Sequence, residues 1–399
     1  MTIHAKLEVV TTLSERDRIR ALLVLAASCG ANRVAMVVES RLRYLDLRGS
    51  LYPIDLSHWL PVVGACLGAI LVHWRGPRAT AIAAAAVSAV GAVTGALHLA
   101  ALDTFLTVLG SGMLTVGAFA FAARLLVPEG EPPSPSRFAA MAGFVLARAA
   151  AMELGSYAWW SWSADTPPAI AHEIAAAFHI AALVGIVRAL PRPQARSDAA
   201  PAQPPYRAPS PLDGPPVAPA ATPSSVVAWR ALRPFVVPSV TFTLGAVGAA
   251  RHMSRSASGL LGGLVAAGAA LYFFLAWRRR SAASPFTLYA RSLMLAAVGW
   301  LLLAVGAFAG GATLHASTIP IALGSSVASL ALGFAALAGR GRSAGVPIVA
   351  WMALTTFVSV VGNSLMTPGA MVSVALFALF TARGIQRREG ESRSYFDSP

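Results

Sequence analysis

The sequence contains little charge, little cysteine and almost no lysine. Charged residues make up 12% of its 399 positions and hydrophobic residues 56%, a composition too apolar for one or two soluble domains. Cys29 and Cys66 lie inside apolar segments without a CxxC spacing, which predicts buried, inert thiols and not metal ligands. Lys6 is the only lysine, so arginine carries nearly all the positive charge. This bias indicates a GC-rich bacterial genome.

Several motifs that would name a reaction are also missing. There is no P-loop, no GxGxxG after a strand, no HExxH or HxxxH spacing and no Asp-rich run for magnesium. The major-facilitator loop motif, a glycine with Asp and Arg between the second and third spans, is not met by WRGPRAT, which has no acid. We therefore assign no catalytic residue and do not expect an enzyme.

Long apolar segments occupy most of the chain. A helix needs about 20 apolar residues to cross a bilayer core of roughly 30 Å. We predict an all-α polytopic membrane protein with twelve transmembrane helices arranged as two six-helix halves. The predicted spans are 20–38, 56–74, 79–101, 104–127, 138–160, 168–190, 234–250, 257–277, 287–309, 316–338, 345–365 and 368–386.

A proline-rich stretch divides these spans into two groups. Residues 191–225 contain eleven prolines and almost no large apolar residue, so they cannot bury enough surface to offset the entropy of ordering. We predict an extended, solvated linker between an N-terminal half (1–190) and a C-terminal half (226–386). A short tail (387–399) follows.

The net charge of +14 does not indicate a nucleic-acid partner, because the arginines cluster at the ends of apolar segments. This is the positive-inside pattern, and it places both termini and the linker in the cytoplasm of a bacterial inner membrane. The run RIRALLVLAASC, which ends at Cys29, loosely resembles a lipoprotein signal, but nearby acidic residues favour an uncleaved first span.

An internal repeat links the fourth and tenth spans. VLGSGMLTVGAFAFAAR (108–124) and ALGSSVASLALGFAALAGR (322–340) share an LGS start, small residues and a closing arginine. Small residues let helices approach closely in lipid, so a packing motif is the simpler interpretation. Because each half has an even number of spans, true repeats would be parallel and related by an axis along the membrane normal.

Histidines within the spans are candidates for function, because ionisable groups at bilayer depth are costly. His98 closes the third span, His315 opens the tenth, and His172 and His179 lie in the sixth. The last two share a helix face but stand roughly 10 Å apart along it, so they cannot bind the same metal or haem iron. They could serve two centres or a proton path, or form hydrogen bonds to neighbouring helices.

Charged residues also lie inside the fifth and sixth spans. Arg148 and Glu153 are about 140° apart around their helix, so each needs a partner on another helix. Glu173 in the sixth span is a candidate partner for Arg148. A structural ion pair and a coupling site are both compatible with this pattern. Arg33 lies near the outer end of the first span, where its side chain can extend to the membrane–water interface, so we do not count it as a candidate site residue.

The stretches HLAALDTFLTVLGSGMLTVGAFAFAARLLVP (98–128) and LHASTIPIALGSSVASLALGFAALAGR (314–340), together with the twelve-span plan, resemble the NnrS family. In that family a histidine precedes a glycine-containing span that ends in arginine. Its members look like haem- and copper-containing inner-membrane proteins linked to the nitric oxide response. The resemblance implies His315 and His98 as the first candidate ligands of haem or copper, with His172 or His179 as secondary ones.

These observations lead to two functional hypotheses. The first is an NnrS-like membrane protein that binds haem or copper. The alternative is a secondary transporter of a small solute, in which Arg148, Glu153, Glu173 and the sixth-span histidines line a path between the halves. A scaffold or assembly factor without any ligand is a third, plainer possibility.

The linker gives the first testable prediction. Cutting the chain within 191–225 and co-expressing the two halves should yield an assembled protein, because the contacts that matter lie between helices. Co-purification of an untagged half with a tagged one measures the assembly. Halves that fail to associate would show that the linker has a role of its own.

Overall fold

The computed structural model describes residues 14–46, 54–97, 99–127, 135–162, 168–189, 255–279 and 344–362, together with parts of 290–305 and 372–384 and residue 337. Within these residues all regular secondary structure is helical and no strand occurs. The helices are α1 (Glu15–Asp46), α2 (Ile54–Arg75), α3 (Pro77–Ala96), α4 (Ala100–Leu126), α5 (Pro135–Trp162), α6 (Pro168–Ala189), α8 (Arg255–Arg278) and α12 (Gly345–Gly362). Helix α12 is the eleventh predicted span, and the seventh and most of the tenth lie outside the described residues.

Proline marks the start of three helices. Pro77, Pro135 and Pro168 are the first residues of α3, α5 and α6, where the missing N–H costs no helical hydrogen bond and the fixed φ suits the helix. Between α2 and α3 a single residue, Gly76, turns the chain with a φ of 85°, which a residue without a Cβ adopts freely. The loop WRGPRAT is therefore a tight connection between two antiparallel helices.

The boundary between the third and fourth spans differs from the prediction. Helix α3 ends at Ala96 and α4 begins at Ala100, whereas the predicted spans met at 101 and 104. Apolar residues continue through this turn, so hydropathy alone could not locate it. His98, predicted to close the third span, falls between the two helices and lies outside the described residues.

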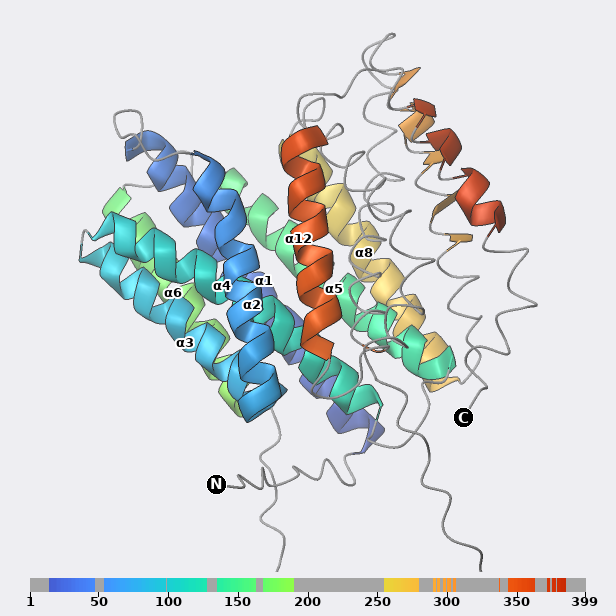
Figure 1. Ribbon diagram of the computed structural model, residues 1–399, viewed down its shortest axis with the longest axis horizontal. Helices are drawn as coiled ribbons and strands as arrows, with labels where there is room; N and C mark the ends of the chain where they lie inside the picture. Colours follow the sequence, from blue (N-terminus) through green and yellow to red (C-terminus); the bar gives the residue numbers. More distant parts are fainter. Residues whose placement is uncertain are drawn as a thin grey trace, which may run out of the picture.

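Helix α4 lies at the centre of the N-terminal half and packs against α2 and α3 (Figure 1). Small residues occupy these crossings. A Cβ atom added to Gly64 would meet the carbonyl oxygen of Leu109, and one on Gly112 would meet that of Pro61. A Cβ on Gly117 would stand 2.8 Å from the backbone nitrogen of Ala81. The three helix backbones thus approach as closely as small residues allow in lipid.

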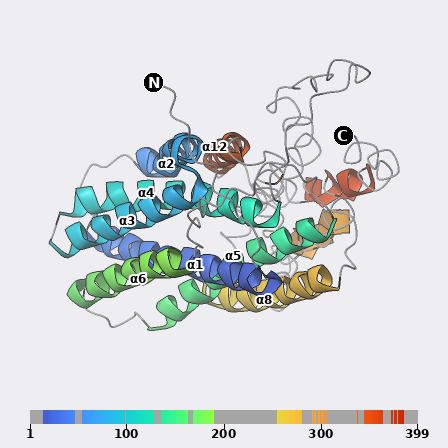
Figure 2. The same cartoon turned by 90° about the horizontal axis from the view of Figure 1, so that it is seen from below.

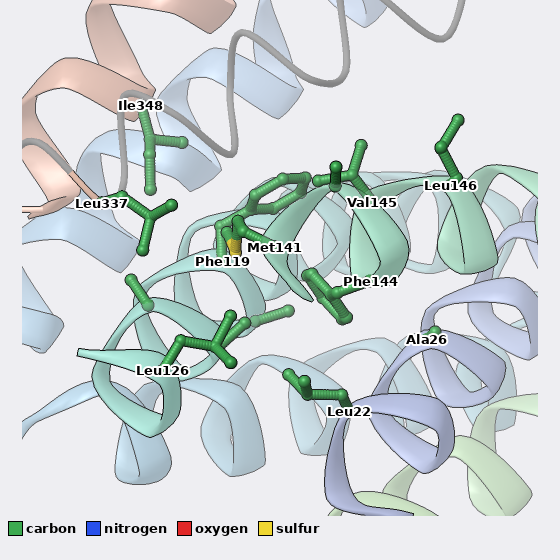
Figure 3. Packing of buried hydrophobic residues seen from close by; sticks show 14 of the residues in the cluster. Leu22, Ala26, Phe119, Leu126, Met141, Phe144, Val145, Leu146, Leu337 and Ile348 are labelled. Carbon is green, nitrogen blue, oxygen red and sulfur yellow. The ribbon is translucent and has the colours of Figure 1, made fainter. Parts of the chain in front are cut away.

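A cluster of large apolar side chains joins α4 to α1 and α5 (Figure 3). Phe119, Phe144 and Met141 are fully buried in it, and Leu22 contributes from α1. The Phe119 and Phe144 rings meet edge to face, with centroids 5.6 Å apart, a favourable aromatic geometry. Ile348 of α12 belongs to the same cluster, so this core continues into the C-terminal half.

Among the described helices, two pairs make the main contacts between the halves. Helix α5 packs on α8 and α2 packs on α12, on opposite sides of the molecule in Figure 2. In two parallel repeats, each span of the first half corresponds to the span six places later. Span five (α5) then corresponds to span eleven (α12), and span two (α2) corresponds to span eight (α8). The two interfaces therefore exchange when the halves are exchanged, as parallel repeats require.

The outer surfaces of the bundle are apolar. Large side chains such as Leu67 and Ile70 on α2 and Leu264 and Leu271 on α8 are exposed, as helices that face lipid require. Five helices of the described part are long and apolar enough to cross a membrane, and α2, α8 and α12 contain shorter apolar stretches. The prediction of a multi-pass α-helical membrane protein is confirmed.

The α5–α8 interface gives the second prediction. Gly263→Leu should destabilise the protein by about 1–3 kcal/mol through overpacking, because a Cβ at Gly263 already lies 2.5 Å from the Leu154 Cγ atom. Gly268→Leu is the matched control on the same helix, since no atom lies within 4 Å of a Cβ there. Thermal unfolding in mild detergent should show a lower midpoint for the first variant alone. Equal midpoints for the two variants would contradict this account of the interface.

Candidate functional site

One turn of α1 brings the polar groups of α5 and α6 together. Cys29 and Arg33 are four residues apart and so share a face of α1, and this face meets α5. Asn32 is about 100° around the helix from Arg33 and meets α6 instead. The segment from Cys29 to Arg33 is therefore the common neighbour of two polar groups.

The first group is centred on Arg148 of α5. Its Nη2 atom donates a hydrogen bond to Thr115 Oγ1 on α4 at 3.4 Å, and its guanidinium carbon lies 5.3 Å from the centroid of the Phe119 ring. The buried thiol of Cys29 interacts with the same guanidinium. We call these four residues the Arg148 site.

Arg148 is close to the middle of a segment that is long and apolar enough to cross a membrane. It lies about 15–18 Å from each end of the apolar segment Ser136–Ala158 at the 1.5 Å rise of a helix. A guanidinium at this depth is costly unless it is paired or hydrated. Its Nε atom is buried and has no hydrogen-bond partner among the described residues. The helices around Arg148 thus satisfy only part of its hydrogen-bonding capacity.

Neighbouring side chains hold the Arg148 site in place. Ser111, Thr115 and Phe119 recur every four residues, so they share one face of α4. The Thr115 hydroxyl donates to the Ser111 carbonyl at 3.0 Å, which leaves its oxygen to accept the bond from Arg148. Phe119 is fully buried against Phe144. Packing therefore fixes both contacts that α4 offers to the guanidinium.

A second cation and an acid lie closer to one membrane surface. Glu153 is exposed on α5 and interacts electrostatically with Arg33 of α1. Arg33 in turn lies within electrostatic range of Arg148. The expectation that Arg148 and Glu153 each need a partner on another helix agrees with these contacts. The expected partnership between Arg148 and Glu173 is wrong, because Glu173 is exposed on α6 while Arg148 meets α1 and α4.

The second group is a buried pair between α6 and α1. His179 Nδ1 lies 2.9 Å from Asn32 Oδ1, so Nδ1 carries the hydrogen and the amide oxygen accepts it. The amide nitrogen of Asn32 donates weakly to the Met36 sulfur at 4.0 Å. His179 is 0% exposed and Asn32 is 3% exposed. For His179 the expected hydrogen bond to a neighbouring helix is present.

The remaining predicted site residues do not join either group. His172 is half-buried on α6, two turns from His179. His98 and His315 lie outside the described residues, so haem and copper binding by these two histidines stays a prediction. Within the part of the chain that the structure describes, no three His, Cys, Asp or Glu side chains are grouped so that they could hold a metal ion.

Three polar residues of these groups were missed or undervalued in the sequence. Thr115 lies inside the repeat motif, Asn32 lies next to Arg33 in the first predicted span, and Arg33 was expected only to extend to the interface. The adjacent polar residues Asn32 and Arg33 inside a predicted span could have indicated this site, because polar residues within a membrane span often mark functional sites. The cysteine prediction is half right, since Cys29 is buried whereas Cys66 is exposed.

Comparisons with known proteins find similarity in structure and none in sequence. No family model matches the sequence, and no curated protein matches it either. The structure, however, is similar to solved transporters. A human organic anion transporter matches with a TM-score of 0.59 and 17% identity, over 96% of this chain and 99% of the other.

Two sugar transporters show the same likeness. The Escherichia coli fucose:proton symporter matches with a TM-score of 0.58 and 14% identity, over 93% of this chain and 98% of the other. A proton:xylose symporter of the major facilitator superfamily matches with a TM-score of 0.61 and 11% identity, over 93% and 95%. The chain thus has the fold of these transporters, and the predicted architecture of two six-helix halves is confirmed.

These comparisons also correct the expected function. The structural neighbours are membrane transporters, so the hypothesis of an NnrS-like haem protein of the nitric oxide response is contradicted. The loop WRGPRAT lacks the acid of the major-facilitator motif, yet the turn at Gly76 forms without it. The findings favour the alternative hypothesis, a secondary transporter.

Proposed function

We propose that this protein is a secondary transporter that moves a small solute along a path between its two six-helix halves. The observation that carries the proposal is the guanidinium of Arg148, held near mid-membrane with a buried Nε atom that lacks a hydrogen-bond partner in the described residues. A static scaffold has no use for such a costly group. A solute that passes the site would supply the missing interactions.

The interfaces between the halves support movement. Among the described helices, α5 with α8 and α2 with α12 make the main contacts between the halves, on opposite sides of the molecule. Rocking of one half against the other around these contacts would open the Arg148 site to each membrane surface in turn. The site belongs to the N-terminal half, since its contacts come from α1, α4 and α5.

The membrane and the orientation are part of the same proposal. Arg75, Arg124 and Arg188 lie in the last turns of α2, α4 and α6, which the positive-inside rule assigns to the cytoplasm. We place the protein in a bacterial inner membrane, with both termini and the linker in the cytoplasm. The solutes named for the structural neighbours, a sugar or an organic anion, are small, and we extend that size class to this protein.

The third prediction tests alternating access without knowledge of the solute. In a Cys29→Ser, Cys66→Ala background, which keeps a hydrogen-bonding group beside Arg148, Ser111→Cys places a thiol one helical turn from Thr115. A membrane-impermeant thiol reagent should label it both in right-side-out and in inside-out vesicles. The measurement is the extent of labelling against time in each preparation.

The control variant is Ser88→Cys in the same background. Ser88 is fully buried between α3 and α4, so its thiol should be reached from neither side. Labelling of Ser111→Cys from a single side, or from none, would rule out a path open alternately to the two surfaces.

A further inference from the structure

We infer that the solute carries a single carboxylate, which the guanidinium of Arg148 binds. This inference rests on the proposed transport function and adds the chemical class of the solute. It follows from the electrostatic balance, the free donors and the depth of the Arg148 site.

The charges near Arg148 do not balance. Arg148 and Arg33 are two cations, whereas the acid that interacts with this pair among the described residues is Glu153, which lies beside Arg33. Glu173 is exposed on α6 and is not among the contacts of Arg148, which come from α1 and α4. The group formed by Arg148, Arg33 and Glu153 therefore has one net positive charge. A monoanion would neutralise it, whereas a cation would add to the repulsion and a neutral polyol would leave the charge in place.

The donors of Arg148 suit a planar oxyanion. Its Nη2 atom already donates to Thr115 at 3.4 Å, a long bond. Its buried Nε atom has no partner in the described part of the chain. A guanidinium presents parallel N–H groups that match the two oxygens of a carboxylate. Thr115 gives its own proton to the Ser111 carbonyl, so the hydroxyl orients the guanidinium and does not donate to the anion.

The surroundings of the site strengthen this interaction. The Phe119 ring lies against the guanidinium, and the Phe119 side chain is fully buried. Apolar walls lower the local dielectric, so a bound anion is attracted more strongly than in water. The aromatic face also keeps Arg148 in one orientation. A carboxylate of small size would thus find a fixed, partly desolvated cation.

The fourth prediction measures the sign of the potential at the Arg148 site. Ser111→Cys in the cysteine-free background is treated, in detergent-solubilised full-length protein, with sulfonatoethyl or trimethylammonioethyl methanethiosulfonate. These reagents share one reaction and have opposite charges. Relative to their rates with free mercaptoethanol, the anionic reagent should react faster by about tenfold or more. Arg148→Gln should abolish the preference.

Two variants separate a specific effect from a general one. Arg148→Lys keeps the charge and should keep the preference, which also controls for misfolding of the glutamine variant. Arg188→Gln removes an exposed arginine from the end of α6 and should leave the preference unchanged. Equal rates for the two reagents, or a faster cationic reagent, would overturn the inference.

Protection by ligands tests the carboxylate itself. Acetate, lactate or benzoate should slow labelling of Ser111→Cys, while the neutral amides of the same acids should not. The Arg148→Lys variant should show weaker protection, because an ammonium cannot form the paired bonds. Equal protection by acids and amides, or protection by no acid, would overturn the carboxylate assignment.

The outcomes also distinguish this inference from the transport function on which it rests. If the thiol is labelled from one membrane side only but still reacts faster with the anionic reagent, alternating access is ruled out and the anion site is supported. If the thiol is labelled from both sides and reacts equally with the two reagents, the transport function is supported and the anionic solute is ruled out. A thiol at position 111 that no reagent reaches would contradict both.

Discussion

The close approach of helix backbones is the constraint on which the rest of the structure depends. In lipid the hydrophobic effect does not press helices together, so packing contacts between small residues must do so. Gly64 and Gly112 bring α2 onto α4, and Gly117 brings α3 onto α4. With α4 enclosed in this way, the face that carries Thr115 and Phe119 is turned towards α5. The position of the guanidinium follows from that arrangement.

The Arg148 site shows how an apolar core can contain a charge without neutralising it. Phe144 and Phe119 pack edge to face, and Arg148 follows Phe144 by one turn of α5, so the guanidinium comes to rest against the Phe119 ring. A hydroxyl and an aromatic face are weak partners for a cation at this depth. Filling the same space with an apolar side chain would stabilise the bundle more. Keeping an arginine there is understandable if a ligand completes the site.

The α1 helix couples this site to a second polar contact. Cys29 and Arg33 face α5, while Asn32 between them faces α6 and holds His179. A buried hydrogen bond of this kind fixes the rotation of one helix against another, because breaking it would strand a polar group in an apolar medium. The contact with His179 of α6 therefore fixes the rotation of α1, and this rotation in turn places Arg33 beside Glu153 of α5.

The sequence by itself determined which segments form membrane-spanning helices and roughly where each one lies, because a bilayer forces each backbone polar group to be satisfied within its own helix. The prolines that begin α3, α5 and α6 were a further signal for the limits of these helices, which hydropathy does not use. Partners were decided by tertiary structure alone. Arg148 contacts Thr115, which is 33 residues away in the sequence, and His179 contacts Asn32, which is 147 residues away. Lipid and protein neighbours are equally apolar, so hydropathy does not show which face of a helix turns inward. For this reason Glu173 was expected as the partner of Arg148, a place that Thr115 takes in the structure.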